Sequence, residues 1–220
     1  TVAANNVTID CNGFKLGNLA AGRSTRAIGV QAADRRNVTV RHCIIRGFRT
    51  GIELLEGEGY LVEHNTVDHS RSNGMKVEGA SSRIYRNQVL STGGGGQYVR
   101  GIWAAADVIE NTVSGVAGFG NHPYSIGMSV WGGNRRIRGN TVRGMVVDAD
   151  YGFASGIDTH GRNMVIADNH VVGPGAQNHG SNGIWSDDLN LNTFCRNNTV
   201  TGFQDNYSGC AHLDGNLALP

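Results

Sequence analysis

The sequence predicts an all-β solenoid, a parallel β-helix built from stacked coils. The first observation is a motif of Asn followed two residues later by Val, which starts at Asn65, Asn87, Asn111, Asn140, Asn169 and Asn198. Its spacings of 22, 24, 29, 29 and 29 residues are typical of repeat architectures. The second observation is a glycine followed by an apolar residue, which recurs in step with the first motif. The two motifs together define one coil as the repeating unit.

Each coil is predicted to hold three short strands. The glycine motif occurs at Gly29, Gly51, Gly74, Gly101, Gly127, Gly156, Gly183 and Gly209, and a short alternating run follows it. The Asn-x-Val motif supplies a second strand, and an apolar run such as Val38-Thr-Val40 precedes it as a third. Such a coil has no room for a ten-residue helix as well. We therefore expect about eight coils of three strands, in one domain over residues 1–220.

The pattern apolar-x-apolar-x-x-Asn-x-Val, followed by a loop and Gly-Ile, resembles the repeats of the right-handed parallel β-helix proteins of the pectin-lyase-like superfamily. The resemblance covers essentially the whole chain. It implies a right-handed single-stranded β-helix. That superfamily includes lyases, hydrolases, epimerases, phage tailspikes and adhesins, so the resemblance implies a fold and names no reaction.

Composition and charge exclude several classes of partner. The formal net charge of +1 gives no strong field for nucleic acid or an anionic membrane, so no nucleic-acid partner is predicted. No run of eighteen apolar residues is present, so no membrane span is predicted either. The chain opens at Thr1 and enters a strand almost at once, which is typical of a processed segment. We expect a microbial protein that is extracellular, periplasmic or displayed on a cell or virion surface.

The four cysteines have no metal-binding spacing; they are Cys11, Cys43, Cys195 and Cys210. The coil register places Cys43 at the repeated Asn position. It aligns Cys195 with Ile166 and Cys210 with Ile184, both core positions. We therefore expect buried thiols that pack as small hydrophobic groups, in preference to disulfides.

The repeated Asn and Val have structural roles. Asn tolerates the left-handed backbone conformation, and its amide both donates and accepts, so stacked Asn side chains can bond from coil to coil. The Val two residues later is expected to point inward and stack on its counterparts. Because neither ladder carries chemistry, a site must be sought among outward side chains.

The strand after each glycine gives two outward columns, in which all three tryptophans lie. The first column is Gln31, Glu53, Lys76, Trp103, Ser129, Asp158, Trp185 and Ala211. The second, two residues further on, is Leu55, Glu78, Ala105, Trp131, His160, Asp187 and Leu213. Flat indole faces suit the apolar faces of sugar rings, and exposed aromatic patches mark binding sites. The alternative is that loops fold over these indoles and bury them.

Acid–base chemistry is predicted at Asp158, His160 and Asp187. Asp158 and His160 share one strand face, and Asp187 lies one coil from His160, where a carboxylate would orient the imidazole and raise its basicity. The segment from Ile157 to His160 resembles the Asp-Pro-His-Asp motif of mannuronan epimerases, with Thr159 in place of Pro and Gly161 in place of the final Asp. Similarly, Asp187 and Asp188 resemble the paired aspartates of polygalacturonases, whose other motifs are absent.

Two reactions assign different roles to these groups. In proton abstraction from a uronate, His160 is the base, Tyr124 or Tyr151 the acid, and Arg162 neutralises the carboxylate. In hydrolysis, Asp158 pairs with Asp187 or Asp188 across the glycosidic bond. The plainer alternative is that His160 is a surface imidazole bonded to a carboxylate without a catalytic role.

Further candidate contacts to substrate lie on the first column and in the loops of coils five to seven. They are Lys76, His122, Tyr124, Tyr151 and His179. No cofactor is predicted. Calcium is a candidate only at Asp148 and Asp150, because the Gly-Gly-x-Gly-x-Asp calcium repeat is absent.

Two functional hypotheses follow from the sequence. The first is a β-helix that binds a polysaccharide or oligosaccharide in a Trp-lined groove, with cleavage (lyase or glycoside hydrolase) or epimerisation as the candidate reaction. The second is a non-catalytic structural or adhesive module, such as part of an adhesin or a phage tail fibre. A monomer favours the first hypothesis and a stable trimer the second.

Overall fold

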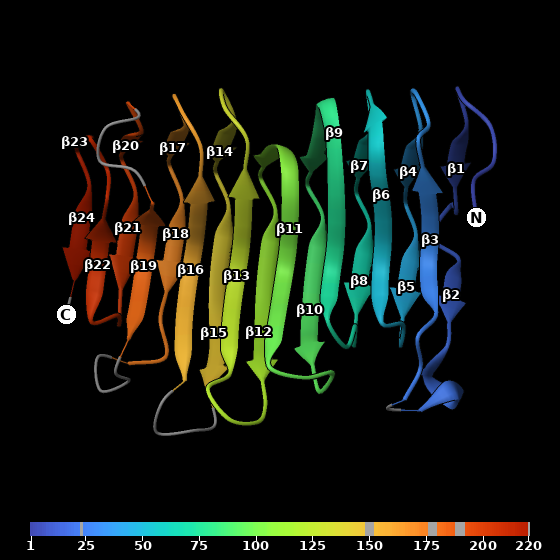
Figure 1. Ribbon diagram of the computed structural model, residues 1–220, viewed down its shortest axis with the longest axis horizontal. Helices are drawn as coiled ribbons and strands as arrows, with labels where there is room; N and C mark the ends of the chain where they lie inside the picture. The colour runs from blue at the N-terminus through green and yellow to red at the C-terminus, as the bar shows by residue number, and fades with distance from the viewer. Residues whose placement is uncertain (23, 148–151, 176–179, 188–191, 220) are drawn as a thin grey trace.

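The chain winds into a rod of stacked coils with its termini at opposite ends (Figure 1). This computed structural model describes residues 1–22, 24–147, 152–175, 180–187 and 192–219. Within those ranges the only helix is the short 3-10 turn η1 (Leu19–Ala21), and strands of neighbouring coils pair in parallel. The predicted all-β parallel β-helix is confirmed.

One wall of the rod is a sheet to which each coil adds one strand. Among the described residues its strands are, in order, β2 (Lys15–Gly17), β5 (Ile44–Arg46), β8 (Thr66–Asp68), β10 (Gln88–Gly93), β12 (Thr112–Gly118), β15 (Thr141–Val147), β18 (His170–Val172), β21 (Thr199–Thr201) and β24 (Leu217–Leu219). Val67, Val89 and Val113 lie opposite one another in the register and are fully buried. The predicted inward Val ladder is therefore confirmed, and we call this sheet the Val wall.

The other two walls share one sheet, because β9 (Asn73–Tyr85) and β11 (Tyr98–Ile109) are long enough to belong to both. The upper wall consists of β1 (Thr8–Asp10), β4 (Thr39–Arg41), β7 (Leu61–Glu63), the ends of β9 and β11, β14 (Arg136–Arg138), β17 (Val165–Ala167), β20 (Phe194–Arg196) and β23 (His212–Asp214). The third wall consists of β3 (Ile28–Ala33), β6 (Thr50–Glu58), the starts of β9 and β11, β13 (Tyr124–Trp131), β16 (Phe153–His160), β19 (Ser181–Ser186) and β22 (Asp205–Ser208). Three strands per coil are confirmed.

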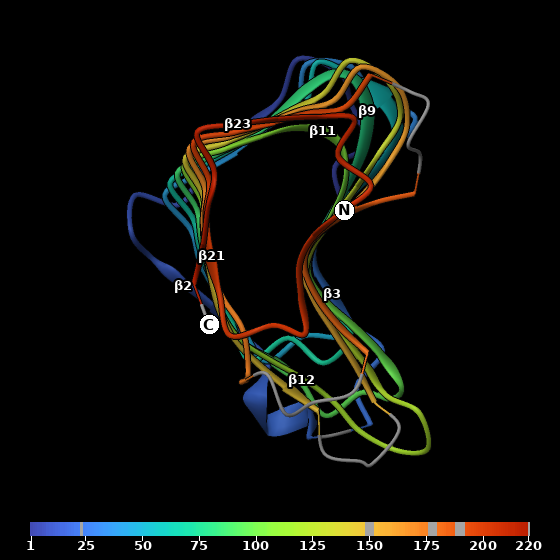
Figure 2. The ribbon, with the colours of Figure 1, turned by 90° about the vertical axis from the view of Figure 1, so that its left-hand side faces the viewer.

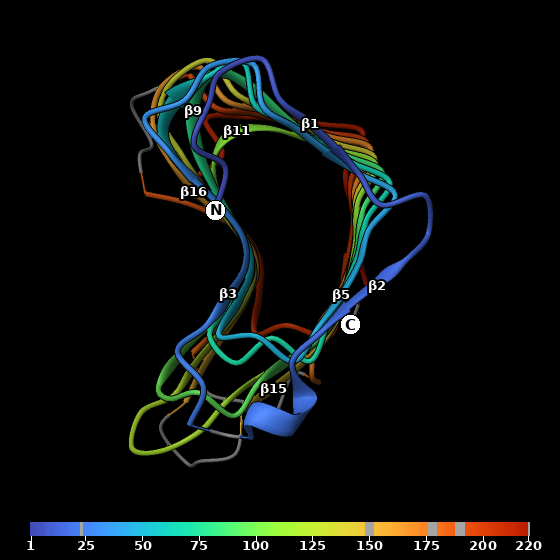
Figure 3. The same ribbon diagram turned by 90° about the vertical axis from the view of Figure 1, so that its right-hand side faces the viewer.

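The third wall bends inward, toward the Val wall, when the rod is viewed along its axis (Figures 2 and 3). We call it the concave wall. The repeated glycines face the Val ladder at this bend: a Cβ built on Gly127 would lie 2.2 Å from Val142 Cγ1 and 2.6 Å from the carbonyl oxygen of Gly156. Gly101 and Val113 approach in the same way, at 2.4 Å. No side chain larger than a hydrogen fits there, which is why the glycine motif keeps step with the Asn-x-Val motif.

The predicted Asn ladder is also confirmed. Asn87 donates from its backbone N–H and from Nδ2 to Oδ1 of Asn111, at 2.9 and 3.0 Å, and Nδ2 donates again to the carbonyl oxygen of Val62 at 2.9 Å. The pattern repeats from Asn65 to Asn198 and extends to Asn216. The left-handed conformation falls one residue earlier than expected, for example at Arg86, whose φ is 52°. The structural role of these Asn residues is therefore the hydrogen bonding of their side-chain amides, not the left-handed backbone conformation.

The expectation of free thiols is wrong, because the four cysteines form disulfides Cys11–Cys43 and Cys195–Cys210. Cys43 does occupy the Asn position, and its backbone N–H donates to Oδ1 of Asn65 at 3.0 Å. A Cys sulfur cannot accept as an amide oxygen does, so a covalent bond links this coil to the preceding one where the amide ladder stops. One disulfide lies toward each end of the rod.

The register predicted for the last coil is also wrong. Ile184 pairs with Tyr207 and Trp185 with Ser208, whereas Leu213 pairs with Cys195 in the upper wall. The positions expected for Gly209, Cys210, Ala211 and Leu213 are therefore not the ones they occupy. The physical reason is a shorter coil, since only 18 residues separate the last two ladder residues, Asn198 and Asn216.

Replacing Gly127 by Ala should destabilise the protein, because the new methyl group would overlap Val142 and the neighbouring backbone. Overpacking of this kind costs about 1–3 kcal/mol. Denaturant unfolding measures the loss. Gly17→Ala is the matched control, since nothing lies within 4 Å of its added Cβ. Equal stability of the two variants would contradict the proposed Gly–Val contact.

Removing the second disulfide with the double substitution Cys195→Ala and Cys210→Ala should loosen the last coil. The cysteines lie 15 residues apart, and closing such a loop contributes about 3 kcal/mol. Because each coil of a solenoid contacts only its neighbours, amide hydrogen exchange should accelerate in β20 to β24 and stay unchanged in β9 to β13. Uniform acceleration along the rod would contradict this local role.

Candidate functional site

The outer face of the concave wall carries the two predicted columns. The register pairs Trp103 with Ser129, Ser129 with Asp158, and Asp158 with Trp185. In the second column it pairs Trp131 with His160. The side chains alternate between core and surface along each strand, so these residues are brought together on one face as the sequence predicted.

His160 lies between two carboxylates. Its Nδ1 is 2.8 Å from Oδ2 of Asp187, and its Nε2 is 3.4 Å from Oδ2 of Asp158. Asp187 follows β19 directly, one coil beyond β16, which is the neighbouring position that the sequence predicted. Asp158 is only 7% exposed, and its Oδ1 is buried with no hydrogen-bond partner among the described residues. The imidazole side chain remains 41% exposed to solvent.

The two carboxylates raise the pKa of His160 to about 9, mainly through the hydrogen bond to Asp158, with Asp187 adding to the effect and burial opposing it. At neutral pH the ring is therefore an imidazolium ion. In that state it donates protons and stabilises negative charge. A role as a base requires that it first release this proton.

The three tryptophans differ in what covers them. Two cations lie over the indole of Trp103: Lys76 Nζ at 4.2 Å and Arg100 Cζ at 4.6 Å from the ring centroid. Trp185 meets His160 edge to face, with centroids 5.2 Å apart. Trp131, at the end of β13, is 40% exposed. Among the three, Trp131 thus has the most exposed indole, while the indoles of Trp103 and Trp185 contact charged side chains.

A second set of aromatic side chains, not identified from the sequence except for Tyr124, lies on the same wall. The rings of Tyr98 and Tyr124 stack with centroids 4.6 Å apart and an interplanar angle of 12°, and Phe153 follows at 5.6 Å. Tyr98 is 52% exposed. We call these three residues the aromatic ladder. Each lies three residues before a repeated glycine, namely Gly101, Gly127 or Gly156. An aromatic residue at this fixed position in three consecutive coils is the sequence signal that could have identified them.

Arg100 links the aromatic ladder to the tryptophan column. Its guanidinium lies 5.9 Å from the ring of Tyr98 and 4.6 Å from that of Trp103. Burial lowers the pKa of Arg100, and the charge of Asp158 opposes that shift. The predicted columns do not include Arg100, because it lies before the glycine, on the other side of the bend from them.

The remaining predicted site residues divide into three groups. Lys76 pairs with Glu78 at 3.4 Å on the concave wall. Arg162 and His122 lie in turns, where their carbonyl oxygens accept from Asn134 N–H at 2.8 Å and Gln97 Nε2 at 2.8 Å. Tyr151, His179 and Asp188 lie outside the described residues.

The part of the chain that the structure describes holds no candidate metal site. Across the described residues, no group of three or more His, Cys, Asp or Glu side chains could hold an ion. The calcium candidates Asp148 and Asp150 lie outside those residues. In the same part of the chain, no helix has the length and apolar character needed to span a bilayer.

Comparison with known families agrees with this architecture. Residues 2–142 match the family model described as right handed beta helix region. The chain belongs to this β-helix family. No curated protein and no solved structure matched the chain. The family is defined by its fold, so the chemistry of this β-helix has to be argued from its own side chains.

The pKa of His160 predicts how stability depends on pH. Below about pH 6.5 the imidazole is protonated in both folded and unfolded states, and its contribution to stability is complete. As the pH rises toward 9, the folded state holds a proton that the unfolded chain releases, so this contribution is progressively lost. An NMR titration of the His160 ring should give a midpoint near 9.

Asp158→Asn removes the main cause of the shift and should move that midpoint down toward the ordinary value. Asp168→Asn, which breaks an ion pair with Arg138 away from His160, should leave it unchanged. A wild-type midpoint near 6.5 would contradict the three-residue arrangement.

Proposed function

We propose that this β-helix binds a polysaccharide along the concave wall. The observation that supports it most strongly is the row of partly exposed aromatic rings across neighbouring coils, from Tyr98 to Phe153, with Trp131 on the same wall. Aromatic side chains combine a large apolar surface with restricted geometry, which suits the apolar faces of sugar rings. A rigid sheet places these rings at a fixed spacing, so little ordering is needed when a ligand binds.

The charges of the concave wall favour a neutral polymer over a polyanion. Lys76 pairs with Glu78 at 3.4 Å, and Arg49 approaches Glu53 at 3.8 Å. The imidazolium of His160 lies between two carboxylates. Among the described residues, three cations of the wall thus have carboxylate partners, and the fourth, Arg100, lies in the field of Asp158, so the wall offers no strong positive field to an anionic chain. Binding should therefore depend on stacking and hydrogen bonding.

Proton transfer to the bound polymer is the candidate reaction. The Oδ1 atom of Asp158 is a buried acceptor with no donor among the described residues, whereas buried polar atoms are normally satisfied. A sugar hydroxyl is a donor of the right kind to complete it. In this proposal Asp187 holds Nδ1 of protonated His160, and a leaving oxygen takes the proton from Nε2 by displacing its 3.4 Å contact with Asp158. This reaction, like the choice among lyase, hydrolase and epimerase, belongs to the proposal.

Substituting Tyr98 or Trp131 by Ala should weaken glycan binding by roughly tenfold, because each change removes a partly exposed ring from the wall. Calorimetry on a panel of neutral and uronate polysaccharides measures the effect. Phe194→Ala is the matched control: this ring is 45% exposed but stacks on His212 in the upper wall. Absence of binding to every glycan, or equal losses in all three variants, would contradict the proposal.

Two further measurements on the same protein, product analysis and light scattering, test for catalysis and for a trimeric assembly. New reducing ends or unsaturated products that disappear in Asp158→Asn and His160→Asn would assign a reaction to the site. Tight binding without products would leave a binding module. A stable trimer by light scattering, with no glycan binding, would favour the adhesin or tail-fibre alternative.

A further inference from the structure

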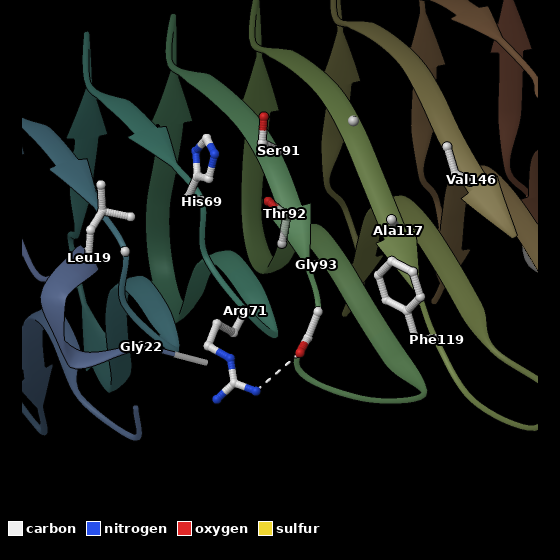
Figure 4. A pocket seen from close by; sticks show the side chains of 13 residues that line it. Leu19, Gly22, His69, Arg71, Ser91, Thr92, Gly93, Ala117, Phe119 and Val146 are labelled. Atoms are coloured by element: carbon white, nitrogen blue, oxygen red, sulfur yellow. Dashed lines mark hydrogen bonds between the residues drawn. The ribbon is translucent and has the colours of Figure 1, made fainter. Parts of the chain in front are cut away.

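A groove of about 710 Å³ lies where the strands of the Val wall bend, and none of its lining residues belongs to a strand of the concave wall (Figure 4). The turn is made at four residues in the left-handed conformation, which are Gly47, His69, Ser91 and Gly115, with φ between 49° and 82°. Two of them have no side chain, which leaves the bend open. The volume falls within the range typical of small-molecule sites.

The side of this groove that β12 and β15 form is apolar and exposed. Val146 of β15 is 51% exposed, Phe119 is 46% exposed, and Ala117 of β12 lies beside them. Leu19 of η1, 51% exposed, lies toward the opposite end of the groove from Phe119 (Figure 4). A ligand whose hydrocarbon chain covered these side chains would remove their unfavourable contact with water.

A fixed cation lies in the same groove. Arg71 donates from its two terminal nitrogens to the carbonyl oxygens of Thr25, at 3.3 Å, and Gly94, at 3.1 Å. Its Nε is buried and has no hydrogen-bond partner among the described residues. No acidic side chain among the described residues pairs with Arg71. The guanidinium is thus held in place by neutral oxygens that do not balance its charge.

The neighbouring charges do not neutralise it either. Asp68 contacts His69 at 2.6 Å and Arg46 at 3.0 Å, so its single negative charge is already engaged by two basic groups. Counted over the residues that the structure describes, this edge of the groove therefore carries a net positive charge. It differs in this respect from the concave wall, where Lys76 and His160 have carboxylate partners.

We propose that the groove binds an amphipathic carboxylate, with its aliphatic chain on Ala117, Phe119 and Val146 and its carboxylate at Arg71. An arginine presents a planar fork that matches a carboxylate, and one positive charge balances one negative charge. A dianionic phosphate would leave excess charge in the groove. The aliphatic walls, with one phenyl ring among them, suit an acyl chain better than a sugar, which sets this groove apart from the proposed glycan site.

Calorimetry with octanoate tests the proposal, with acetate and 1-octanol as probes that carry only the charge or only the chain. Octanoate should bind, and each of the other two at least about tenfold more weakly. Val146→Asp, which places a negative charge at an exposed position, should also weaken octanoate binding by at least about tenfold. Arg71→Met should have a similar effect, and Arg71→Lys a smaller one.

Arg143→Gln is the matched control, because Arg143 lies on the Val wall outside the groove and is exposed. It should bind octanoate like the wild type, as should Tyr98→Ala on the concave wall. Octanol binding as tight as octanoate binding would overturn the role of Arg71. No octanoate binding, or binding that Val146→Asp leaves unchanged, would overturn the groove as the site. Either result leaves the glycan proposal untouched.

Discussion

The contact between the repeated glycines and the Val ladder is the constraint on which the rest of the structure depends. A Cβ on Gly156 would lie 2.2 Å from Val171 Cγ1, so the two walls meet through a single layer of side chains at this level. The concave wall bends there for that reason. Arg100 and Trp103 stand on either side of Gly101, and the bend brings the guanidinium within 4.6 Å of the indole centroid. Close packing inside the rod thus assembles the charged and aromatic groups outside it.

The Asn ladder fixes a second feature of the geometry, which is the register of each coil on the next. Asn111 accepts from Asn87 and donates to a backbone oxygen, so a coil that slipped would bury unsatisfied amides. In a low-dielectric interior such groups are costly, which gives the register a steep free-energy minimum. A slip of one residue would also turn Asp158 into the core. The arrangement of His160 between Asp158 and Asp187 therefore depends on amides on a different wall.

Sequence alone could predict what periodicity controls. The fold, the Val and Asn ladders, and the placement of Asp158, His160 and Asp187 all follow from strand alternation and coil length. Tyr98 and Arg100 were not predicted because they precede the repeated glycine. The bend at the glycine interrupts the alternation of inward and outward side chains, so the register of the residues after it does not carry over to those before it. The Cys11–Cys43 disulfide was missed although its separation of 32 residues brings the two sulfurs together one coil apart. The groove beside Arg71 depends on the path of the turns, which no repeated motif specifies.

Each of the two outer surfaces carries a charged group that lacks one of its partners. Inside the rod, by contrast, each ladder amide from Asn65 to Asn198 is hydrogen-bonded to its neighbour in the next coil. Outside it, among the residues that the structure describes, Oδ1 of Asp158 is a buried acceptor without a donor and Arg71 is a cation without a counterion. Polar groups left unsatisfied in this way lower stability, and they are expected where binding completes them. A hydroxyl would complete the first and a carboxylate the second, so the two surfaces select different chemistry on one scaffold.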